Sequence, residues 1–227
     1  MNVQKDNKTG LFYRPEKMEL HIIKEQPQYK TLDFTNKRFM DVGANIGAVS
    51  YMAVKGGASA IIGYEPMPDT FEVLKMNMEG KATILNKALV GDNKQFISFF
   101  LHKKYPSCHT TVPVKGRDKI DVGCLNFWQE LNNFKPHVIK IDIEGAEYDF
   151  MLQNNFPDYV EEFAIELHMK NEKQKQMAIQ IVKKFDNWYV HRKFKFNWHV
   201  TTMVVKKNKP SEFGLVKDYM LSGVKGL

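Results

Sequence analysis

The chain has 227 residues, 43% of them hydrophobic and 26% charged, which excludes a chain disordered throughout and leaves room for one large domain. No stretch approaches the ~18 consecutive apolar residues of a membrane span, and the first residues form no apolar signal region. The cysteines, Cys108 and Cys124, lack the spacing of metal ligands or of a disulfide framework. We therefore expect a soluble, cytoplasmic protein with no membrane span.

The positive charge is concentrated near the carboxyl terminus. Residues 183–227 contain ten Lys and Arg against three Asp and Glu, and their net charge of +7 equals that of the whole chain. A solvated lysine surface explains this distribution, and an anionic partner such as RNA or a phosphorylated sugar is the alternative.

Short apolar runs alternate with helical patterns along the chain, which predicts a parallel sheet covered on both faces. The expected strands are residues 38–42, 60–64, 82–90, 138–142 and 163–168, with 95–101 as a hairpin partner of the third. The expected helices are residues 48–54, 70–78 with Asp69 as cap, 125–134, 143–152 and a segment around 177–185. Residues 188–190 and 200–205 are expected to close the sheet as an antiparallel pair.

Residues 38–47 indicate a buried strand, a glycine turn and the start of a helix, which together outline a nucleotide-cofactor pocket. Gly43 permits a tight turn and close approach to a ligand, and Gly47 permits close packing of the helix. Asn45 tolerates positive φ, and the turn, with Ala44, is expected to contact the cofactor through its backbone. The alternative is an ordinary turn between a strand and a helix.

Two acids favour one cofactor over another. Glu65 ends a second apolar run about 20 residues after the turn, where an acid would hold ribose hydroxyls. Asp41 lies two residues before the turn, where a carboxylate would repel a pyrophosphate and attract the cationic amino and sulfonium groups of S-adenosylmethionine. The pair favours S-adenosylmethionine, with a nicotinamide-dependent oxidoreductase as the less favoured alternative.

The alternation of strands and helices matches an α/β, doubly wound, Rossmann-like class I methyltransferase fold, mostly parallel and closed by the antiparallel pair. Residues 41–47 (DVGANIG), 139–147 (IKIDIEGAE) and 165–168 (IELH) together resemble the FkbM family of S-adenosylmethionine-dependent methyltransferases. The resemblance covers about residues 37–170, and the string 140–147 is its most specific part. It implies methylation of a hydroxyl oxygen on a sugar or another small molecule. We expect an arm or cap over 1–36, the methyltransferase domain over 37–205 and a basic tail over 206–227.

Methyl transfer to oxygen requires the donor and acceptor to be held close and a proton to be removed. We assign Asp41 to the methionine end of the cofactor and Glu65 to its ribose. Asp142 is expected beside the methyl group, where it orients the donor or acceptor. His168 is the candidate base because its ordinary pKa is near neutrality, and a packed strand-end histidine is the alternative.

Glu144 completes the candidate catalytic set, although Glu144 and Glu147 would equally suit the start of a helix. Asp142, Glu144, Glu166 and His168 could also gather Mg²⁺ or Mn²⁺, but no metal is predicted. Residues 188–198 mix aromatic and basic side chains, which fits an amphipathic edge strand better than a nucleic-acid surface. RNA ribose methylation and a catalytically inactive RNA-binding module remain as alternatives.

Overall fold

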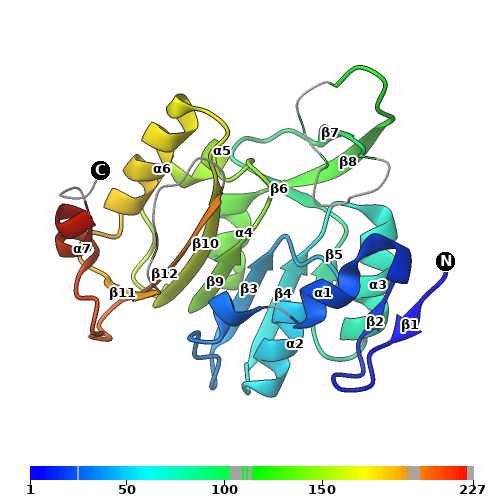
Figure 1. Ribbon diagram of the computed structural model, residues 1–227, viewed down its shortest axis with the longest axis horizontal. Helices are drawn as coiled ribbons and strands as arrows, with labels where there is room; N and C mark the ends of the chain where they lie inside the picture. Colours follow the sequence, from blue (N-terminus) through cyan, green and yellow to red (C-terminus); the bar gives the residue numbers. More distant parts are fainter. Residues whose placement is uncertain are drawn as a thin grey trace.

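A seven-stranded sheet forms the centre of the computed structural model, which describes residues 1–24, 26–102, 109, 111, 114–192, 194 and 200–223 (Figure 1). Its strand order is β11-β12-β10-β9-β3-β4-β5, and β12 runs antiparallel to both of its neighbours. The strands are β3 (Arg38–Val42), β4 (Ala60–Tyr64), β5 (Thr83–Leu85), β9 (Val138–Ile141), β10 (Glu162–His168), β11 (Tyr189–Arg192) and β12 (Val200–Lys206). The predicted fold class, including the closing antiparallel pair, is confirmed.

Helices connect these strands and place the ligand crevice. The helices are α2 (Ala48–Lys55), α3 (Pro68–Met78), α4 (Phe127–Phe134), α5 (Tyr148–Met151), α6 (Glu172–Lys183) and α7 (Val216–Gly223). From β3 the chain builds outward through β4 and β5, whereas β9 and β10 extend the sheet on the other side of β3. Ligands bind such sheets at the carboxyl ends of the strands where the order reverses, which here are the ends of β3 and β9.

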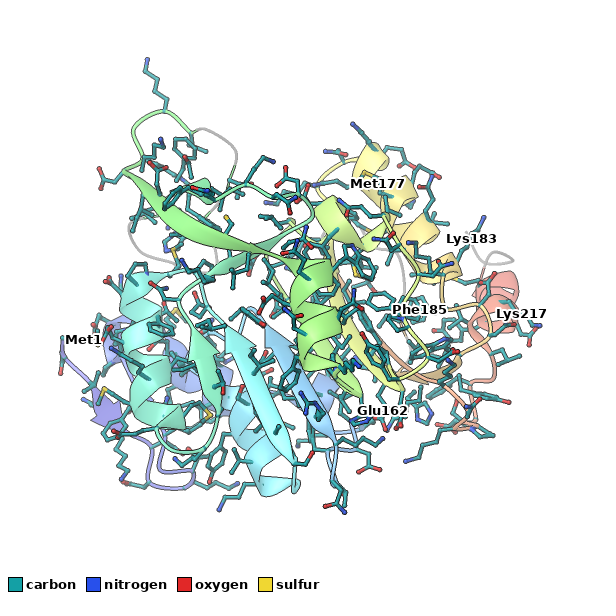
Figure 2. All side chains as sticks on the ribbon, turned by 180° about the vertical axis from the view of Figure 1, so that it is seen from behind. Met1, Glu162, Met177, Lys183, Phe185 and Lys217 are labelled. Atoms are coloured by element: carbon teal, nitrogen blue, oxygen red, sulfur yellow. The ribbon has the colours of Figure 1, made fainter. Side chains whose placement is uncertain are left out.

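Successive strand residues point to opposite sides of the sheet, and both sides are buried. Met40, Ile139 and Ile165 face α4, α5 and α6 in one core cluster. Phe39 and Val138 face α2 and the amino-terminal segment in a second cluster. Phe185, which follows α6, packs against Phe163 of β10 with ring centroids 5.0 Å apart (Figure 2).

The expected third strand is two strands that belong to different sheets. β5 ends at Leu85, and β6 (Ala88–Val90) pairs in parallel with β8 (Lys119–Asn126), a strand not foreseen from the sequence. β7 (Phe96–Phe100) pairs antiparallel with β8, so the predicted hairpin with the third strand is wrong. The break follows from Asn86, whose amide Nδ2 donates to the carbonyl oxygens of Glu65 and Pro66 at 2.8 and 2.9 Å. Cys124 is buried in this second sheet, and Cys108 lies outside the described residues.

Two helix starts also differ from expectation. Helix α3 begins at Pro68, whose missing N–H suits the first turn, and no side chain caps it, so the predicted cap at Asp69 is wrong. The helix expected over 143–152 is reduced to α5, because Glu144 and Gly145 have φ of 57° and 102°. Positive φ at two successive residues is incompatible with a right-handed helix.

The amino-terminal segment packs on the domain through β1 (Gln4–Lys5), β2 (Phe12–Tyr13), η1 (Pro15–Lys17), α1 (Glu19–Lys24) and η2 (Pro27–Tyr29). Figure 1 shows β1, β2 and α1 beside α2 and α3. Asn77 of α3 fixes this segment, since its side chain bonds to the N–H and carbonyl of Phe12 and to the carbonyl of Ile46. The division into arm, domain and tail stays a prediction. Among the described residues, none of the helices has the length and apolar character needed to cross a bilayer.

Candidate active site

The glycine turn after β3 is held tightly in an unusual backbone conformation. Gly43, Asn45 and Gly47 all have positive φ, at 79°, 51° and 89°. The N–H groups of Gly43 and Ala44 donate to the carbonyl oxygen of Tyr64 at 3.0 and 2.9 Å. A Cβ at Gly47 would lie 2.9 Å from Leu74 Cδ1, so this glycine permits the close approach of α3, whereas the sequence assigned it to the packing of the helix that follows it. The turn is therefore fixed by β4 and α3 before any ligand arrives.

Glu65, at the end of β4, bonds directly to the glycine turn. Its Oε2 accepts from the Asn45 N–H and its Oε1 from the Met67 N–H, both at 2.9 Å. Only 6% of the residue is exposed, and burial raises the pKa of its carboxyl to about 7 although both hydrogen bonds oppose this. Each oxygen retains a lone pair for a further donor.

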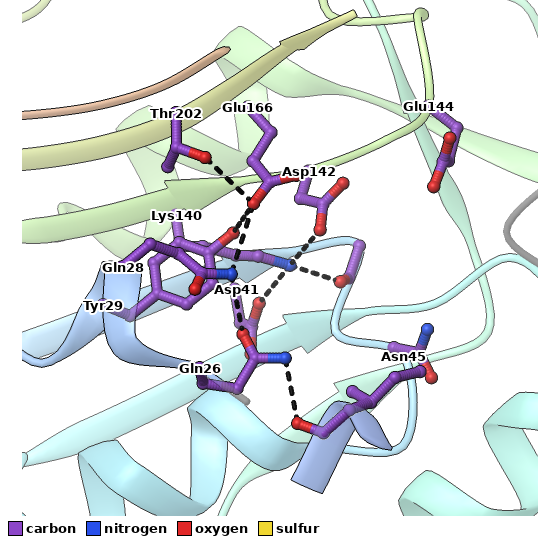
Figure 3. Close-up of polar contacts among 12 residues, drawn as sticks. Gln26, Gln28, Tyr29, Asp41, Asn45, Lys140, Asp142, Glu144, Glu166 and Thr202 are labelled. Carbon is purple, nitrogen blue, oxygen red and sulfur yellow. Dashed lines mark hydrogen bonds and ion pairs between the residues drawn. The ribbon is translucent and has the colours of Figure 1, made fainter. Parts of the chain in front are cut away.

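Asp41 faces the protein interior, where two partners meet it. Its Oδ2 accepts from Ser50 Oγ at 2.7 Å. Its Oδ1 lies 3.4 Å from Lys140 Nζ (Figure 3). Lys140 Nζ also donates to the Gly43 carbonyl oxygen at 2.6 Å and lies 3.9 Å from Asp142 Oδ2. Burial lowers the pKa of Lys140, but Asp41 and Asp142 outweigh it and the net shift is upward. The Asp41 charge is thus balanced within the protein.

The three predicted catalytic side chains come together at the ends of β9 and β10. His168 Nε2 lies 3.5 Å from Glu144 Oε2 and 4.0 Å from Asp142 Oδ1. On the other side of the ring, Nδ1 lies 3.3 Å from Glu147 Oε1. One ligand atom from each of Asp142, Glu144 and His168 lies within 4.8 Å of the others.

Burial and the neighbouring charged groups alter the pKa values of His168 and Glu144. Burial lowers the pKa of His168, but Glu147, Glu144 and Asp142 raise it to about 9, above the near-neutral value expected from the sequence. Withdrawal from water raises the pKa of Glu144 to about 7, with His168 opposing and Asp142 adding to the rise. Between pH 7 and pH 9 the pair therefore exists as a carboxylate beside an imidazolium.

Glu166, the fourth acid named for a metal, lies apart from this group. Its Oε1 accepts from the Tyr29 hydroxyl at 3.1 Å and from Thr202 Oγ1 at 3.2 Å, with Gln28 Nε2 at 3.4 Å. Asp142, Glu144 and His168 are the only His, Cys, Asp or Glu side chains, among the described residues, that gather closely enough for a metal ion. Two carboxylates and an imidazole suit Mg²⁺ or Mn²⁺ better than zinc, and they equally suit proton transfer.

A single cavity of about 600 Å³ connects these parts. Gly43, Asn45 and Glu65 line one part of it, and Asp142 and Glu144 line another. The second sheet contributes further lining residues, including Leu89, Ile97 and Phe99. The volume lies within the range that small-molecule sites occupy.

The predicted site residues omitted two buried residues of this site, one of which, Glu147, was named only for the start of a helix. Lys140 is 3% exposed and Glu147 is fully buried. The available signal for Lys140 was a lone cation within the apolar strand Val138–Ile141, which predicts a buried counter-ion. Glu147 carried no separate signal, because acids are common near helix starts.

The family model described as the methyltransferase FkbM domain matches residues 41–194, which include the glycine turn, Glu65 and the group around His168. This chain belongs to the FkbM methyltransferase family. The FkbM chain is therefore an S-adenosylmethionine-dependent methyltransferase, as the sequence predicted, and the oxidoreductase alternative is set aside.

The FkbM chain is also similar to solved structures. One is fibrillarin from Aeropyrum pernix with natively bound S-adenosyl-L-methionine, at 10% identity over 90% of this chain and 81% of that chain, with a TM-score of 0.48. Another is precorrin-6y C5,15-methyltransferase from Geobacter metallireducens, at 9% identity over 90% and 94% of the two chains, with a TM-score of 0.46. No curated protein matches the sequence.

Proposed function

We propose that this enzyme transfers the methyl group of S-adenosylmethionine to a hydroxyl oxygen of a sugar or another small molecule. The observation that carries the proposal is the cavity that joins the glycine turn and Glu65 to Asp142 and Glu144, with His168 directly behind Glu144. Donor, acceptor and proton-accepting group can then meet in one cavity.

The cofactor end is supported by the lone pairs and backbone groups that remain available. The ribose hydroxyls can donate to the Glu65 carboxylate, whose position is already fixed by Asn45 and Met67. The cofactor would pass along Gly43 and Asn45 toward Asp142. Ala44 and Gly47 shape the turn, since their N–H groups donate to the carbonyl oxygens of Tyr64 and Ala44. Asp41 would act through Lys140 and the Gly43 carbonyl.

The chemistry is a displacement at the methyl carbon. The acceptor oxygen forms a bond to that carbon while the carbon–sulfur bond breaks, and sulfur keeps the electron pair. The hydroxyl proton passes to Glu144, which is a carboxylate above about pH 7. The His168 imidazolium beside it stabilises negative charge that develops on the acceptor oxygen. Asp142 orients the acceptor next to the methyl group.

The basic carboxyl-terminal region supports a small acceptor more than RNA. Lys206 is 2% exposed and pairs with Glu162 at 2.7 Å, and Lys207 pairs with Asp158 at 2.6 Å. These cations are occupied by neighbouring acids, which leaves less charge for phosphates. Residues 193 and 195–198 of the aromatic and basic run lie outside the described residues. A cytoplasmic location stays a prediction.

Calorimetry on the wild type and on Glu65→Ala tests the cofactor assignment, with S-adenosylhomocysteine as ligand and NAD as the contrast. Glu72→Ala is the matched control, because Glu72 is exposed on α3 and pairs with Lys75. We expect binding of S-adenosylhomocysteine that Glu65→Ala alone abolishes. A screen of hydroxyl acceptors with labelled S-adenosylmethionine follows. Binding of NAD only, or methyl transfer to RNA and to no small hydroxyl, would contradict the proposal.

A further inference from the structure

Glu147 is a buried acid whose carboxylate joins two parts of the site. Its Oε1 accepts a hydrogen bond from the His168 N–H at 2.6 Å and lies 3.3 Å from His168 Nδ1. Its Oε2 accepts from the Gly145 N–H at 2.8 Å. It makes no side-chain cap to α5, so helix capping does not account for it. A fully buried carboxylate is costly unless charged or polar partners surround it.

The next residue holds His168 from a second direction. The Tyr148 hydroxyl donates to the His168 carbonyl oxygen at 3.1 Å. Glu147 and Tyr148 together therefore fix the amide, the carbonyl and the ring of His168. Strand pairing continues up to His168 on the β12 side, where it lies opposite Val200.

The Gly145 contact extends this arrangement to the acid on the other side of the ring. Gly145 follows Glu144, and both have positive φ, so the loop keeps this shape only if a neighbouring group holds it. Glu147 is that group. The same carboxylate thus holds both the loop that carries Glu144 and the strand end that carries His168. Glu144 Oε2 and His168 Nε2 lie 3.5 Å apart.

We propose that Glu147 is a positioning residue that holds His168 and Glu144 in register and directs the Nδ1–H of His168 toward itself. Nε2 is thereby aimed at Glu144 and Asp142, two acids that line the cavity. This inference rests on the proposed function, since it assigns the support of the same proton-transfer pair. The charged groups that face His168 are Glu147, Glu144, Asp142 and, farther off, Glu166. An imidazolium between Glu147 and Glu144 compensates the buried carboxylate.

The test compares Glu147→Gln with Glu172→Gln, since each replaces one carboxylate by an amide and Glu172 is exposed on α6. The imidazole of His168 is titrated by NMR in protein saturated with S-adenosylhomocysteine, and His168→Gln assigns its signal. We expect its pKa to fall from about 9 toward the ordinary value of 6.5 in Glu147→Gln and to stay in Glu172→Gln. Affinity for S-adenosylhomocysteine should change less than about twofold, because the contacts of Glu65 are intact.

The outcomes separate this inference from the proposed function. A folded Glu147→Gln protein with an unchanged His168 pKa overturns the inference, even if the variant is less stable. If Glu147→Gln does not fold, Glu147→Asp keeps the charge and shortens the reach. A lowered His168 pKa in Glu147→Asp supports the inference, and a His168 pKa equal to that of the wild type overturns it. Failure of the wild type to bind S-adenosylhomocysteine would instead overturn the cofactor assignment.

Discussion

Gly43 lies so close to Asp142 that a Cβ built on the glycine would be 1.9 Å from the Asp142 carbonyl oxygen. The backbones of the turn after β3 and of the end of β9 approach each other directly there. This is the point where the strand order reverses, and the glycine turn and the loop that carries Glu144 meet there. A side chain at position 43 would separate the two.

Gly43→Ala should therefore destabilise the protein by about 3 kcal/mol or more, because positive φ and the overlap both oppose it. Gly57→Ala is the matched control, since Gly57 has φ of 76° and no atom of the described residues lies within 4 Å of an added Cβ. That variant should lose only about 1–2 kcal/mol. Urea unfolding measures both. Equal losses in the two variants would show that the approach to Asp142 is unimportant.

Lys140→Met should cost about 3–5 kcal/mol, because it leaves Asp41 buried without its counter-ion and releases the Gly43 carbonyl. Adding Asp41→Asn removes the stranded charge and should restore much of the loss. A double-mutant cycle by urea unfolding gives the coupling. Additive losses from the two substitutions would contradict the assigned ion pair.

Glu65 predicts a pH dependence of stability. Its pKa is about 7 in the folded protein and 4.5 ordinarily, so the folded state binds the extra proton between these values. Its favourable contribution is complete below pH 4.5 and is lost as the pH rises through 7, by up to about 3 kcal/mol. The stability of the wild type relative to Glu65→Gln should therefore fall from pH 5 to pH 8. A relative stability that rises over this range would refute the shift.

The sequence predicted the parts of this protein that depend on local pattern. The buried runs around Phe39 and Ile139 and the turn at Gly43 produced the correct sheet and the correct cofactor class. The second sheet was missed because Asn86 interrupts the third strand through long-range bonds to Glu65 and Pro66, which leave no periodic signal.

Prediction of the site was also limited by long-range contacts, which leave no signal in the sequence. Asp142, Glu144 and His168 were selected correctly as neighbours, since strand ends meet at one edge of a parallel sheet. The pKa of His168 depends on three carboxylates that approach it from the loop between β9 and α5, and sequence spacing does not give those distances. In the same way, the expectation that Asp41 attracts a cationic cofactor did not include Lys140, because this counter-ion comes from a different strand.

The rate of methyl transfer should rise with pH through about 7 and then level, because Glu144 accepts the acceptor's proton only as a carboxylate. Glu144→Gln should lower the rate by about 10²- to 10⁴-fold and remove the inflection. The side chain of Glu161 is 47% exposed, so Glu161→Gln should keep the wild-type rate and the inflection. Single-turnover rates from pH 5.5 to 9.5, with an acceptor from the hydroxyl screen, measure this. An inflection that persists in Glu144→Gln would exclude Glu144 as the base. An inflection of the wild type near 9 would assign the proton to His168, because that is where its imidazolium dissociates.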